Sequence, residues 1–455
     1  RGLRAVVLNG TYVPVFLTAG SAQLGIAPLL DAMIELLPSP IQARQAAGQG
    51  KEGEEILKAA DSGPLAAYVW KTTADPFVGK ITFLRIYSGS LHADSRVWNN
   101  VKGQEERLGT LNITRGKDQM SVKAAHAGDI VSVAKLSVTA TGDTFCDKAH
   151  PLTMPVPEYP HSLYSVAINP KSQADSAKLS PTLSRLCEED KTLSWRQEPS
   201  TAQTILQGMG DQHIDVAIRK AENKFQTALH IEIPRVPYQE AITKEAAAMH
   251  RHKKQTGGAG QFAEVHLRVL PLPEADFEFS NDVFGGSISN NFMPSIEKGV
   301  RSVMKDGVIA GFPVQNVKVS VYDGKEHPVD SKPIAFEAAG REAFKAAVRE
   351  AGPVLREPIM NVRIVVPESN MGDILGDMNT RRARVQGMDT ERGRSVVTAT
   401  VPLAEMQRYT TDLRSMTGGR GVFSMEFSHY EVVPAHIAQE VINQRQKELQ
   451  AAKEE

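Results

Sequence analysis

The chain has few of the residues that build disulfide frameworks and metal centres. Its only cysteines in 455 residues are Cys146 and Cys187, which lie far apart and have no metal-like partner spacing. This usage favours reduced cysteines, as in the cytoplasm. The sequence has no uninterrupted run of about 18 apolar residues and no signal peptide, so neither a membrane span nor secretion is predicted. We therefore expect a cytoplasmic protein without a membrane partner or a metal site.

The chain also lacks an excess of charge of either sign. Lys and Arg number 52 against 53 Asp and Glu, which gives a formal net charge of -1. Any surface that binds nucleic acid must therefore be local. Hydrophobic residues make up 41% and charged residues 23%, as in soluble globular proteins. At this length we expect about three or more domains.

Catalytic signatures are missing as well. No Ser-His-Asp or Cys-His arrangement can be defended, and no pair of carboxylates stands out from the scattered acidic residues. The glycines at 257, 258 and 260 are not followed by the lysine and hydroxyl residue of a P-loop. We assign no catalytic residue.

Hydrophobic periodicity divides the chain into segments. Short β runs between Gly, Asp and Asn turns predict a closed β-barrel. The order β, α, β, β, α, β occurs twice and predicts two ferredoxin-like domains that flank a further α+β domain, so the fold class is multidomain α+β. The predicted segments are a strand, turn and helix at 1–40, a solvated linker at 41–62, the barrel at 63–155, ferredoxin-like domains at 159–235 and 357–433, the middle α+β domain at 236–356, and a charged helix at 434–455.

The start of the sequence favours a fragment. The chain begins at Arg1, and strand-like runs at 3–8 and 13–17 follow with nothing before them to pair with. We therefore expect an excised or partly ordered piece of a longer protein.

A basic, glycine-rich stretch is the strongest local signal. Residues 251–261 read Arg-His-Lys-Lys-Gln-Thr-Gly-Gly-Ala-Gly-Gln. Long cations beside a conformationally permissive backbone suit close approach to phosphate, which predicts a loop that contacts nucleic acid. An ordinary surface turn is the alternative. The candidate RNA-binding residues are Arg251, Lys253, Lys254, Gln255, Gly257, Gly258 and Gln261.

A second loop, at 324–332, carries a histidine. If the strands that flank the two loops are neighbours, both loops lie at one end of the same domain. His327 precedes a proline and is therefore expected to be extended, where it could hydrogen-bond or stack on RNA. We add His327, Asp330 and Ser331 as candidate RNA-binding residues. A plain surface turn is again the alternative.

Three arginines follow a helical pattern near residue 380. Arg381, Arg382 and Arg384 complement the dipole at a helix C-terminus. Contact with RNA phosphate explains them equally well, so both interpretations stay open.

Seven short motifs occur in a consistent order. They are Asp-Pro-Phe-Val-Gly-Lys at 75–80, Ala-Gly-Asp at 127–129, Thr-Gly-Asp-Thr at 141–144, Gly-Met-Gly-Asp-Gln-His at 208–213, Glu-Pro-Ile-Met at 357–360, Met-Gly-Asp-Ile-Leu-Gly-Asp at 371–377 and Met-Glu-Phe-Ser-His-Tyr at 425–430. Together they resemble the second, third and fifth domains of translation elongation factor G, the ribosomal translocase GTPase. The resemblance covers nearly the whole chain.

The resemblance implies a remnant of a nucleotide site near the start of the chain. Gly20, Ser21 and Ala22 are similar to part of the family's last guanine-nucleotide motif. The P-loop, the switch segments and the Asp-x-x-Gly and Asn-Lys-x-Asp motifs are absent from this sequence. The family's phosphate and Mg²⁺ machinery needs them, so we expect this chain to hold no cofactor and to hydrolyse no GTP. GTP and Mg²⁺ are expected in the full-length protein.

The resemblance further implies that the middle domain is an arm whose tip enters the decoding region. The basic loop matches one tip loop, and the family's tip histidine falls on His327. The implied partners are the ribosome, tRNA and mRNA, the implied function is GTP-dependent translocation, and we expect a monomer.

Departures from the family pattern keep other functions open. Where the family commonly has Gly-Gly-Arg-Gly-Gln-Tyr-Gly, this chain has Ala259 in place of the arginine and Ala263 in place of the last glycine. Pro328 stands where the family usually has Asp. A divergent ribosome-associated GTPase that acts in recycling, rescue or ribosomal protection is therefore one alternative. A GTP-independent RNA-binding module is another.

Overall fold

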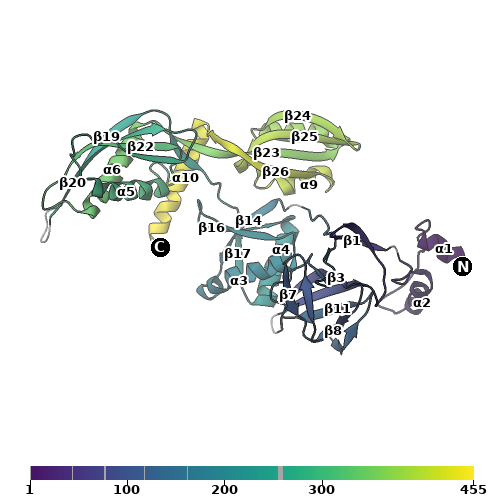
Figure 1. Cartoon of the computed structure of the whole chain (residues 1–455). Helices are drawn as coiled ribbons and strands as arrows, with labels where there is room; N and C mark the ends of the chain where they lie inside the picture. The colour runs from purple at the N-terminus through teal and green to yellow at the C-terminus, as the bar shows by residue number, and fades with distance from the viewer. Residues whose placement is uncertain are drawn as a thin grey trace. The chain divides into compact units, whose positions relative to one another are not determined.

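The computed structural model of the chain describes residues 2–43, 45–75, 78–116, 118–160, 162–254 and 260–454. The chain divides into two compact units, each taken by itself below (Figure 1). The first unit contains Arg1–Pro160, Pro170–Ser194 and Val216–Leu229, and the second contains His161–Asn169, Trp195–Asp215 and His230–Glu455. Within the described ranges, no helix has the length and apolar character needed to cross a membrane.

The N-terminal segment is helical where a strand was predicted. Helix α1 spans Gly2–Leu8 and α2 spans Ile26–Leu36, while residues 12–18 between them lie outside any strand. The strand predictions for 3–8 and 13–17 are therefore wrong. A strand needs a partner for its N–H and C=O groups, and the described residues supply none here, whereas a helix pairs these groups internally.

The predicted linker contains a β-hairpin. Strands β1 (Ala46–Gly50) and β2 (Gly53–Leu57) pair with each other, and β1 also pairs with β13 (Leu152–Thr153). At Gly48 a Cβ would come within 3.0 Å of the Leu152 side chain, so the glycine permits close packing here. The expectation of a solvated linker fails because the third strand comes from a distant part of the sequence.

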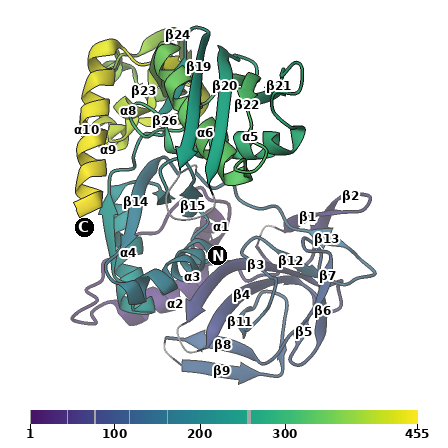
Figure 2. The same ribbon diagram turned by 90° about the vertical axis from the view of Figure 1, so that its left-hand side faces the viewer.

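A large antiparallel sheet follows. Its strands, with the short β5 and β10, are β3 (Ala66–Asp75), β4 (Gly79–Ser88), β5 (Leu91–His92), β6 (Arg96–Asn99), β7 (Gln104–Arg107), β8 (Leu111–Arg115), β9 (Asp118–Val122), β10 (Ala124–Ala125), β11 (Ile130–Ala134) and β12 (Thr144–Cys146). The hydrogen-bonded order is β7-β6-β12-β3-β4-β11-β8-β9 (Figure 2). Strands β5 and β10 pair separately. Leu84, Leu111 and Phe145 are fully buried in its core.

The predicted closed barrel is wrong in one respect. The end strands β7 and β9 do not pair with each other among the described residues, so the ladder stays open. Strand β9 is exposed at four of its five positions and forms a solvent-facing edge. Helix α3 (Gln173–Glu189) packs beside β3 in the same unit, where the Ala74 N–H donates to Glu189 Oε1 at 2.7 Å.

The β, α, β, β, α, β order of elements predicted for the first ferredoxin-like domain is confirmed. The elements are β14 (Tyr164–Pro170), α3, β15 (Ser194–Glu198), β16 (Gln203–Gly208), α4 (Asp211–Phe225) and β17 (Leu229–Glu232). Their four strands form one sheet in the order β15-β16-β14-β17.

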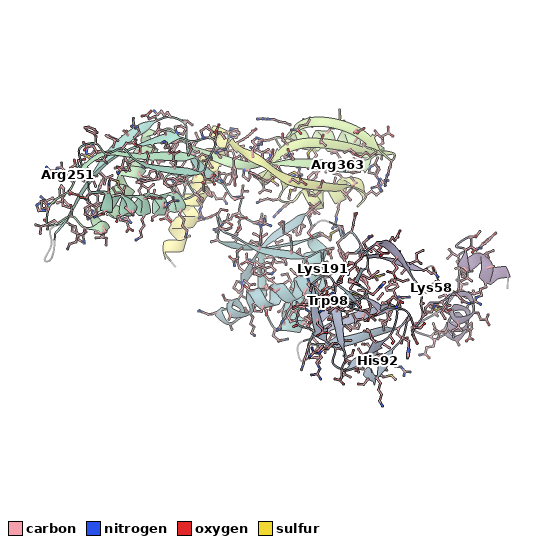
Figure 3. The ribbon with its side chains drawn as sticks, in the orientation of Figure 1. Lys58, His92, Trp98, Lys191, Arg251 and Arg363 are labelled. Carbon is pink, nitrogen blue, oxygen red and sulfur yellow. The ribbon has the colours of Figure 1, made fainter. Side chains whose placement is uncertain are left out.

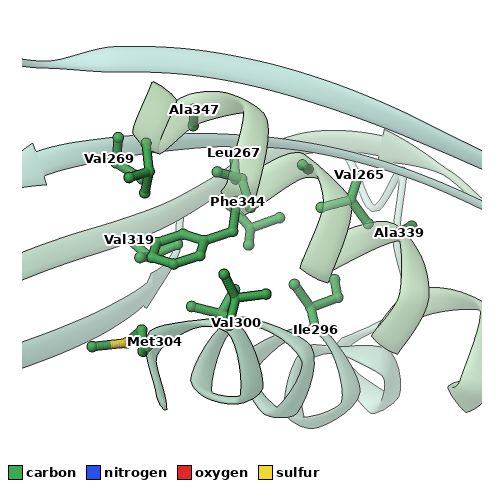
Figure 4. Packing of buried hydrophobic residues seen from close by; sticks show 14 of the residues in the cluster. Val265, Leu267, Val269, Ile296, Val300, Met304, Val319, Ala339, Phe344 and Ala347 are labelled. Atoms are coloured by element: carbon green, nitrogen blue, oxygen red, sulfur yellow. The ribbon is translucent and has the colours of Figure 1, made fainter. Parts of the chain in front are cut away.

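The middle domain, residues 239–350, is a sheet covered by two helices. Its elements are β18 (Gln239–Ile242), β19 (Ala246–Lys254), β20 (Gln261–Pro271), β21 (Phe277–Asn281), the 3₁₀ turn η1 (Asn290–Phe292), α5 (Met293–Asp306), β22 (Val317–Lys325) and α6 (Pro333–Glu350). The sheet order is β19-β20-β22-β21. Alternate residues of β20, such as Val265 and Leu267, meet Val300 of α5 and Phe344 of α6 (Figure 4).

The C-terminal part repeats the ferredoxin-like order. Its elements are β23 (Pro353–Pro367), the 3₁₀ turn η2 (Glu368–Asn370), α7 (Met371–Thr380), β24 (Arg384–Glu391), β25 (Arg394–Pro402), α8 (Leu403–Met406), α9 (Tyr409–Thr417), β26 (Val422–Val432) and the terminal helix α10 (Ala435–Glu454). The first four residues of β23 pair with β18 of the middle domain, and most of its remaining length pairs with β25 and β26. The fold class is multidomain α+β, as predicted.

A buried carboxylate fixes the base of the middle domain. Glu240 of β18 is fully buried, and its side chain accepts hydrogen bonds from the N–H groups of Val308, Ile309, Ala310 and Phe312 at 2.6–3.2 Å. Four backbone donors compensate for the removal of this charge from water. The carboxylate therefore holds the loop after α5 against the strand that joins β23.

We expect Glu240→Ala to open this loop. The substitution leaves four buried N–H groups without their acceptor, which costs about 3 kcal/mol of local opening free energy. Hydrogen exchange of amides 308–312 should then be about a hundredfold faster. Glu245→Ala is the matched control, because Glu245 is exposed and its one ion-pair partner among the described residues is Arg268 at 3.5 Å. Equal exchange in both variants would contradict the role given to Glu240.

Candidate nucleic-acid interface

The two predicted RNA-binding loops meet at one end of the middle domain. Strands β20 and β22 pair antiparallel, so the loop before β20 and the loop after β22 lie at the same edge of the sheet. The Phe262 N–H donates to the Asp330 carbonyl at 3.0 Å, and Ser331 Oγ donates to the Phe262 carbonyl at 2.8 Å. The predicted convergence is confirmed. We call residues 251–254, 260–262 and 325–332 the tip; Figure 3 labels Arg251 there.

His327 is held in a defined orientation. Its N–H donates to Ser331 Oγ at 2.8 Å, and the Ser331 N–H returns a bond to the His327 carbonyl at 3.2 Å. The ring Nδ1 accepts from the N–H groups of Val329 and Asp330 at 3.3 and 3.2 Å. In the neutral ring the proton is therefore on Nε2, which has no partner among the described residues. The side chain is 50% exposed, so Nε2 is available as a donor to a ligand.

The close approach of the loops depends on a glycine. At Gly260 an added Cβ would lie 2.7 Å from the Asp330 carboxylate, which is closer than real side chains allow. Gln261 follows and its Oε1 lies 3.0 Å from His252 Nε2. The predicted contacts Gln255, Gly257 and Gly258 lie outside the described residues, and their roles stay predictions.

The tip carries four lysines without internal partners. Lys253, Lys254 and Lys325 are exposed and Lys332 is half-buried. None of the four has an ion-pair partner among the residues that the structure describes. Four uncompensated ammonium groups at one end of a domain favour an anionic ligand.

Two acidic side chains near the tip accept hydrogen bonds within the protein, whereas the Asp330 carboxylate in the tip lies 3.6 Å from His327 Nδ1. Glu326 accepts from both the N–H and the Oγ of Ser289 at 3.0 Å. Asp323 accepts from Ser287 Oγ at 2.9 Å and from the Gly324 N–H at 2.8 Å. These bonds hold the carboxylates in place, so the tip presents unpaired positive charges beside fixed negative ones.

Glu264 compensates one of the predicted cations. This buried residue on β20 bonds both Arg251 and His266, with His266 Nε2 3.0 Å from its carboxylate. The hydrogen bond from His266 and then that from Arg251 lower the pKa of Glu264 below its usual value. Arg251 is therefore at the tip but, unlike the four lysines, is paired.

The three arginines after α7 are also paired. The Arg381 guanidinium bonds Asp377 and Asp412 at 2.8 and 2.7 Å. Arg382 holds the buried Glu357 through two bonds of 2.6 and 2.9 Å, and this pairing raises the pKa of the Arg382 guanidinium. Arg384 bonds the carboxylate of Glu431 at 3.0 and 3.1 Å but stays 75% exposed.

These pairs give the arginines a structural role that the sequence did not indicate. Asp377 is the i,i+4 neighbour of Arg381 at the end of α7, but Asp412, Glu357 and Glu431 come from other elements, so sequence spacing could not reveal those three. Contact of the arginines with RNA stays a prediction, for which the exposed Arg384 is the best placed. The structure does not bring the three arginines into the tip, because they belong to the C-terminal part of the chain.

The remnant nucleotide motif forms a tight turn. Ala19 and Leu24 make an isolated bridge, and the Gln23 N–H donates to the Gly20 carbonyl at 3.2 Å. Gly20, Ser21 and Ala22 are exposed. Their part in nucleotide binding stays a prediction. No group of three or more His, Cys, Asp or Glu side chains placed to hold a metal is found within the described ranges.

Sequence reasoning missed a third loop beside the tip. Residues 282–289 connect β21 to η1 and bond to the end of β22 through Ser287 and Ser289. Phe284 in this loop is 96% exposed. The available signal was a phenylalanine directly before Gly285 and Gly286, a composition typical of an exposed turn.

Four family models match consecutive parts of the chain. Their descriptions are Elongation factor G domain 2 at residues 64–148, Elongation Factor G, domain III at 159–233, Elongation factor G, domain IV at 234–352 and Elongation factor G C-terminus at 354–441. A crystal structure of a protein from Thermus thermophilus is also similar, with 35% sequence identity and a TM-score of 0.76. The match covers 98% of this chain and 64% of that one.

We expect Glu264→Gln to destabilise the tip in a pH-dependent way. Because the folded-state pKa of Glu264 is lowered, its stabilising effect is present above the unfolded-state pKa of about 4 and is lost as pH falls through the lower folded-state value. At pH 7 the variant should lose roughly 1–2 kcal/mol of protection in β19 and β20, measured by hydrogen exchange. The difference should shrink below about pH 4; a difference that grows there would contradict the assignment.

We expect the free-energy cost of replacing each arginine to depend on how deeply its carboxylate partner is buried. Arg382→Ala leaves the buried Glu357 carboxylate without its bidentate partner and should cost about 3–5 kcal/mol. Arg384→Ala breaks an exposed pair and should cost less than about 1 kcal/mol. Hydrogen exchange of β23, which carries Glu357, measures the first loss, and exchange of β24 and β26, which carry Arg384 and Glu431, measures the second. Co-sedimentation of Arg384→Ala with ribosomes tests the RNA contact separately, since this variant should stay folded.

Proposed function

The chain belongs to the elongation factor G family, and from that premise we propose that it acts in translocation of tRNA and mRNA on the ribosome. GTP and Mg²⁺ would be bound by a GTPase domain of the complete gene product, as the family resemblance implies. The middle domain serves as the arm, and its tip contacts RNA. The proposal places the protein in the cytoplasm as a monomer that binds ribosomal RNA and ribosomal proteins.

The observation that supports this function is that the lysines at the tip have no ion-pair partners among the described residues. The four unpaired lysines, exemplified by Lys253 and Lys325, stand beside the free Nε2 donor of His327. The carboxylates of Asp323 and Glu326 are already hydrogen-bonded inside the domain. Lysines suit phosphate as flexible point charges, whereas an oriented imidazole suits a defined donor contact to a base or phosphate.

The mechanism is differential binding. GTP commits the factor to the ribosome, and the tip then binds the moved positions of tRNA and mRNA better than the earlier ones. An arm can shift this equilibrium only by the difference in its affinity for the two states. The hydrogen-bonded turn at His327 reduces the conformational entropy that such a contact would otherwise cost.

A divergent paralogue is the second candidate. Pro328 at the tip has no backbone N–H to donate, and the family usually has an acidic residue there. Of the other two departures, Ala259 lies outside the described residues and Ala263 is buried on β20. A paralogue would use the same tip in recycling, rescue or ribosomal protection. The third candidate is an RNA-binding module that needs no GTP.

Toeprinting with the complete gene product separates these candidates, because only a translocase shifts the mRNA by one codon. We expect His327→Ala to slow the shift about tenfold, as for a lost contact of about 1.4 kcal/mol in the transition state. Unchanged translocation by His327→Ala would refute the assigned tip role. A wild-type protein that releases or rescues ribosomes without a codon shift would favour the paralogue. Salt-dependent binding of ribosomal RNA by the 455-residue chain alone would favour the GTP-independent module.

We expect the tip lysines to set the salt dependence of ribosome binding. Each lysine that neutralises a phosphate contributes about one unit to the slope of log affinity against log salt. Lys253→Ala should lower that slope by about one, as measured by co-sedimentation at several salt concentrations. Lys305→Ala, an exposed lysine near the end of α5, is the matched control and should leave the slope unchanged. Equal slopes for Lys253→Ala and wild type would place the RNA contact elsewhere.

A further inference from the structure

The third loop, residues 282–289, is anchored to the strand that leads into the His327 turn. Its first backbone donor is the Asp282 N–H, which bonds the Val321 carbonyl at 2.8 Å. Ser287 Oγ donates to Asp323, and Ser289 donates twice to Glu326, the residue directly before His327. The loop therefore lies beside the tip at the same edge of the sheet.

The base of this loop is closed by its own side chains. Asn281 Nδ2 donates to Asn290 Oδ1 at 3.0 Å, and the Val283 N–H donates to Asn281 Oδ1 at 3.1 Å. Ile288 is buried under the loop at 2% exposure. These bonds leave the centre of the loop, rather than its ends, to project into solvent.

Phe284 is at that centre and has no packing. Its side chain is 96% exposed, and it makes no ring contact among the described residues. Gly285 and Gly286 follow in left-handed conformation, with φ of 77° and 73°. Exposure of a whole aromatic ring forgoes the free energy that its burial would supply. An anchored loop thus presents a ring that only an external partner can cover.

The surroundings favour RNA as that partner. An aromatic ring that docks on a protein partner is typically surrounded by apolar residues. The ring of Phe284 instead lies at the end of a domain beside four unpaired lysines and a donor histidine. Proteins bind unpaired nucleotides through two features. Cationic side chains contact the phosphate backbone of the nucleic acid, and aromatic rings stack on its bases. Both occur here on neighbouring loops.

We propose that Phe284 is a third RNA contact of the arm and stacks on an unpaired nucleobase of the RNA that the tip reaches. The inference rests on the proposed function, since it requires the tip to approach RNA. The lysines hold the phosphates, His327 contributes the directed donor, and Phe284 contributes the stacking surface, which accepts any base.

Site-specific photocrosslinking tests the proposal. The complete gene product carries p-benzoylphenylalanine in place of Phe284 in one sample and of His327 in another, and each is irradiated on ribosomes that hold tRNA and mRNA. We expect both positions to crosslink to RNA nucleotides. A crosslink from 284 to ribosomal protein alone, or none from 284 while 327 reacts with RNA, overturns the stacking contact and leaves the proposed function intact. No RNA crosslink from either position overturns both.

Substitutions separate stacking from apolar contact. Phe284→Trp keeps an aromatic face, whereas Phe284→Leu keeps apolar bulk without one. Because base stacking is worth a factor of about 5 to 150 in affinity, Phe284→Leu and Phe284→Ala should weaken ribosome binding about tenfold and Phe284→Trp should not. Equal affinity for Leu and Trp would overturn stacking. The exposed Val432 at the end of β26, outside the tip, supplies the control, since Val432→Ala changes apolar surface without an aromatic ring and should have little effect.

Discussion

The buried Glu240 carboxylate is the constraint on which the middle domain depends. It sits on β18, the strand that pairs with the start of β23, and it gathers four backbone donors from the loop after α5. A charge can be buried only where such donors replace water. The loop, the helix before it and the sheet are therefore fixed together at the base, and the opposite edge is free to carry loops that do not stabilise the fold.

That freedom explains the arrangement of charge at the tip. Loops that are not needed for the core can leave ammonium groups unpaired, while the carboxylates that share the surface are bonded by serine hydroxyls and backbone N–H groups. The arginines of the C-terminal part show the opposite arrangement, because Arg381 and Arg382 direct their donors to acidic partners. The two basic clusters look alike in the sequence and differ in what their charges are free to bind.

Much of the fold followed from the sequence, and part of the site did. The sequence placed the two tip loops together only on the condition that their flanking strands are neighbours, and the antiparallel pairing of β20 with β22 meets that condition. The hairpin at 46–57 was missed because the strand that pairs with it, at 152–153, is remote in the sequence. Phe284 was missed because exposure is a property of the folded loop. The pairing of Arg382 with Glu357 could not be predicted either, since 25 residues and two elements separate them.

Strand β23 has a mechanical consequence. Its 15 residues begin in a ladder with the middle domain and end in the sheet of the C-terminal part. At about 3.3 Å per residue the strand is about 50 Å long, and bending it requires the inter-strand hydrogen bonds of the sheet to break. The ladder between β23 and β26 is interrupted between Ile359 and Met360, where Ser428 of β26 is the extra residue of a bulge, and we expect the strand to bend most easily there. A rotation of the C-terminal part would thus be transmitted to the base of the middle domain along the continuous backbone of β23. The strand would bend mainly at the single bulge.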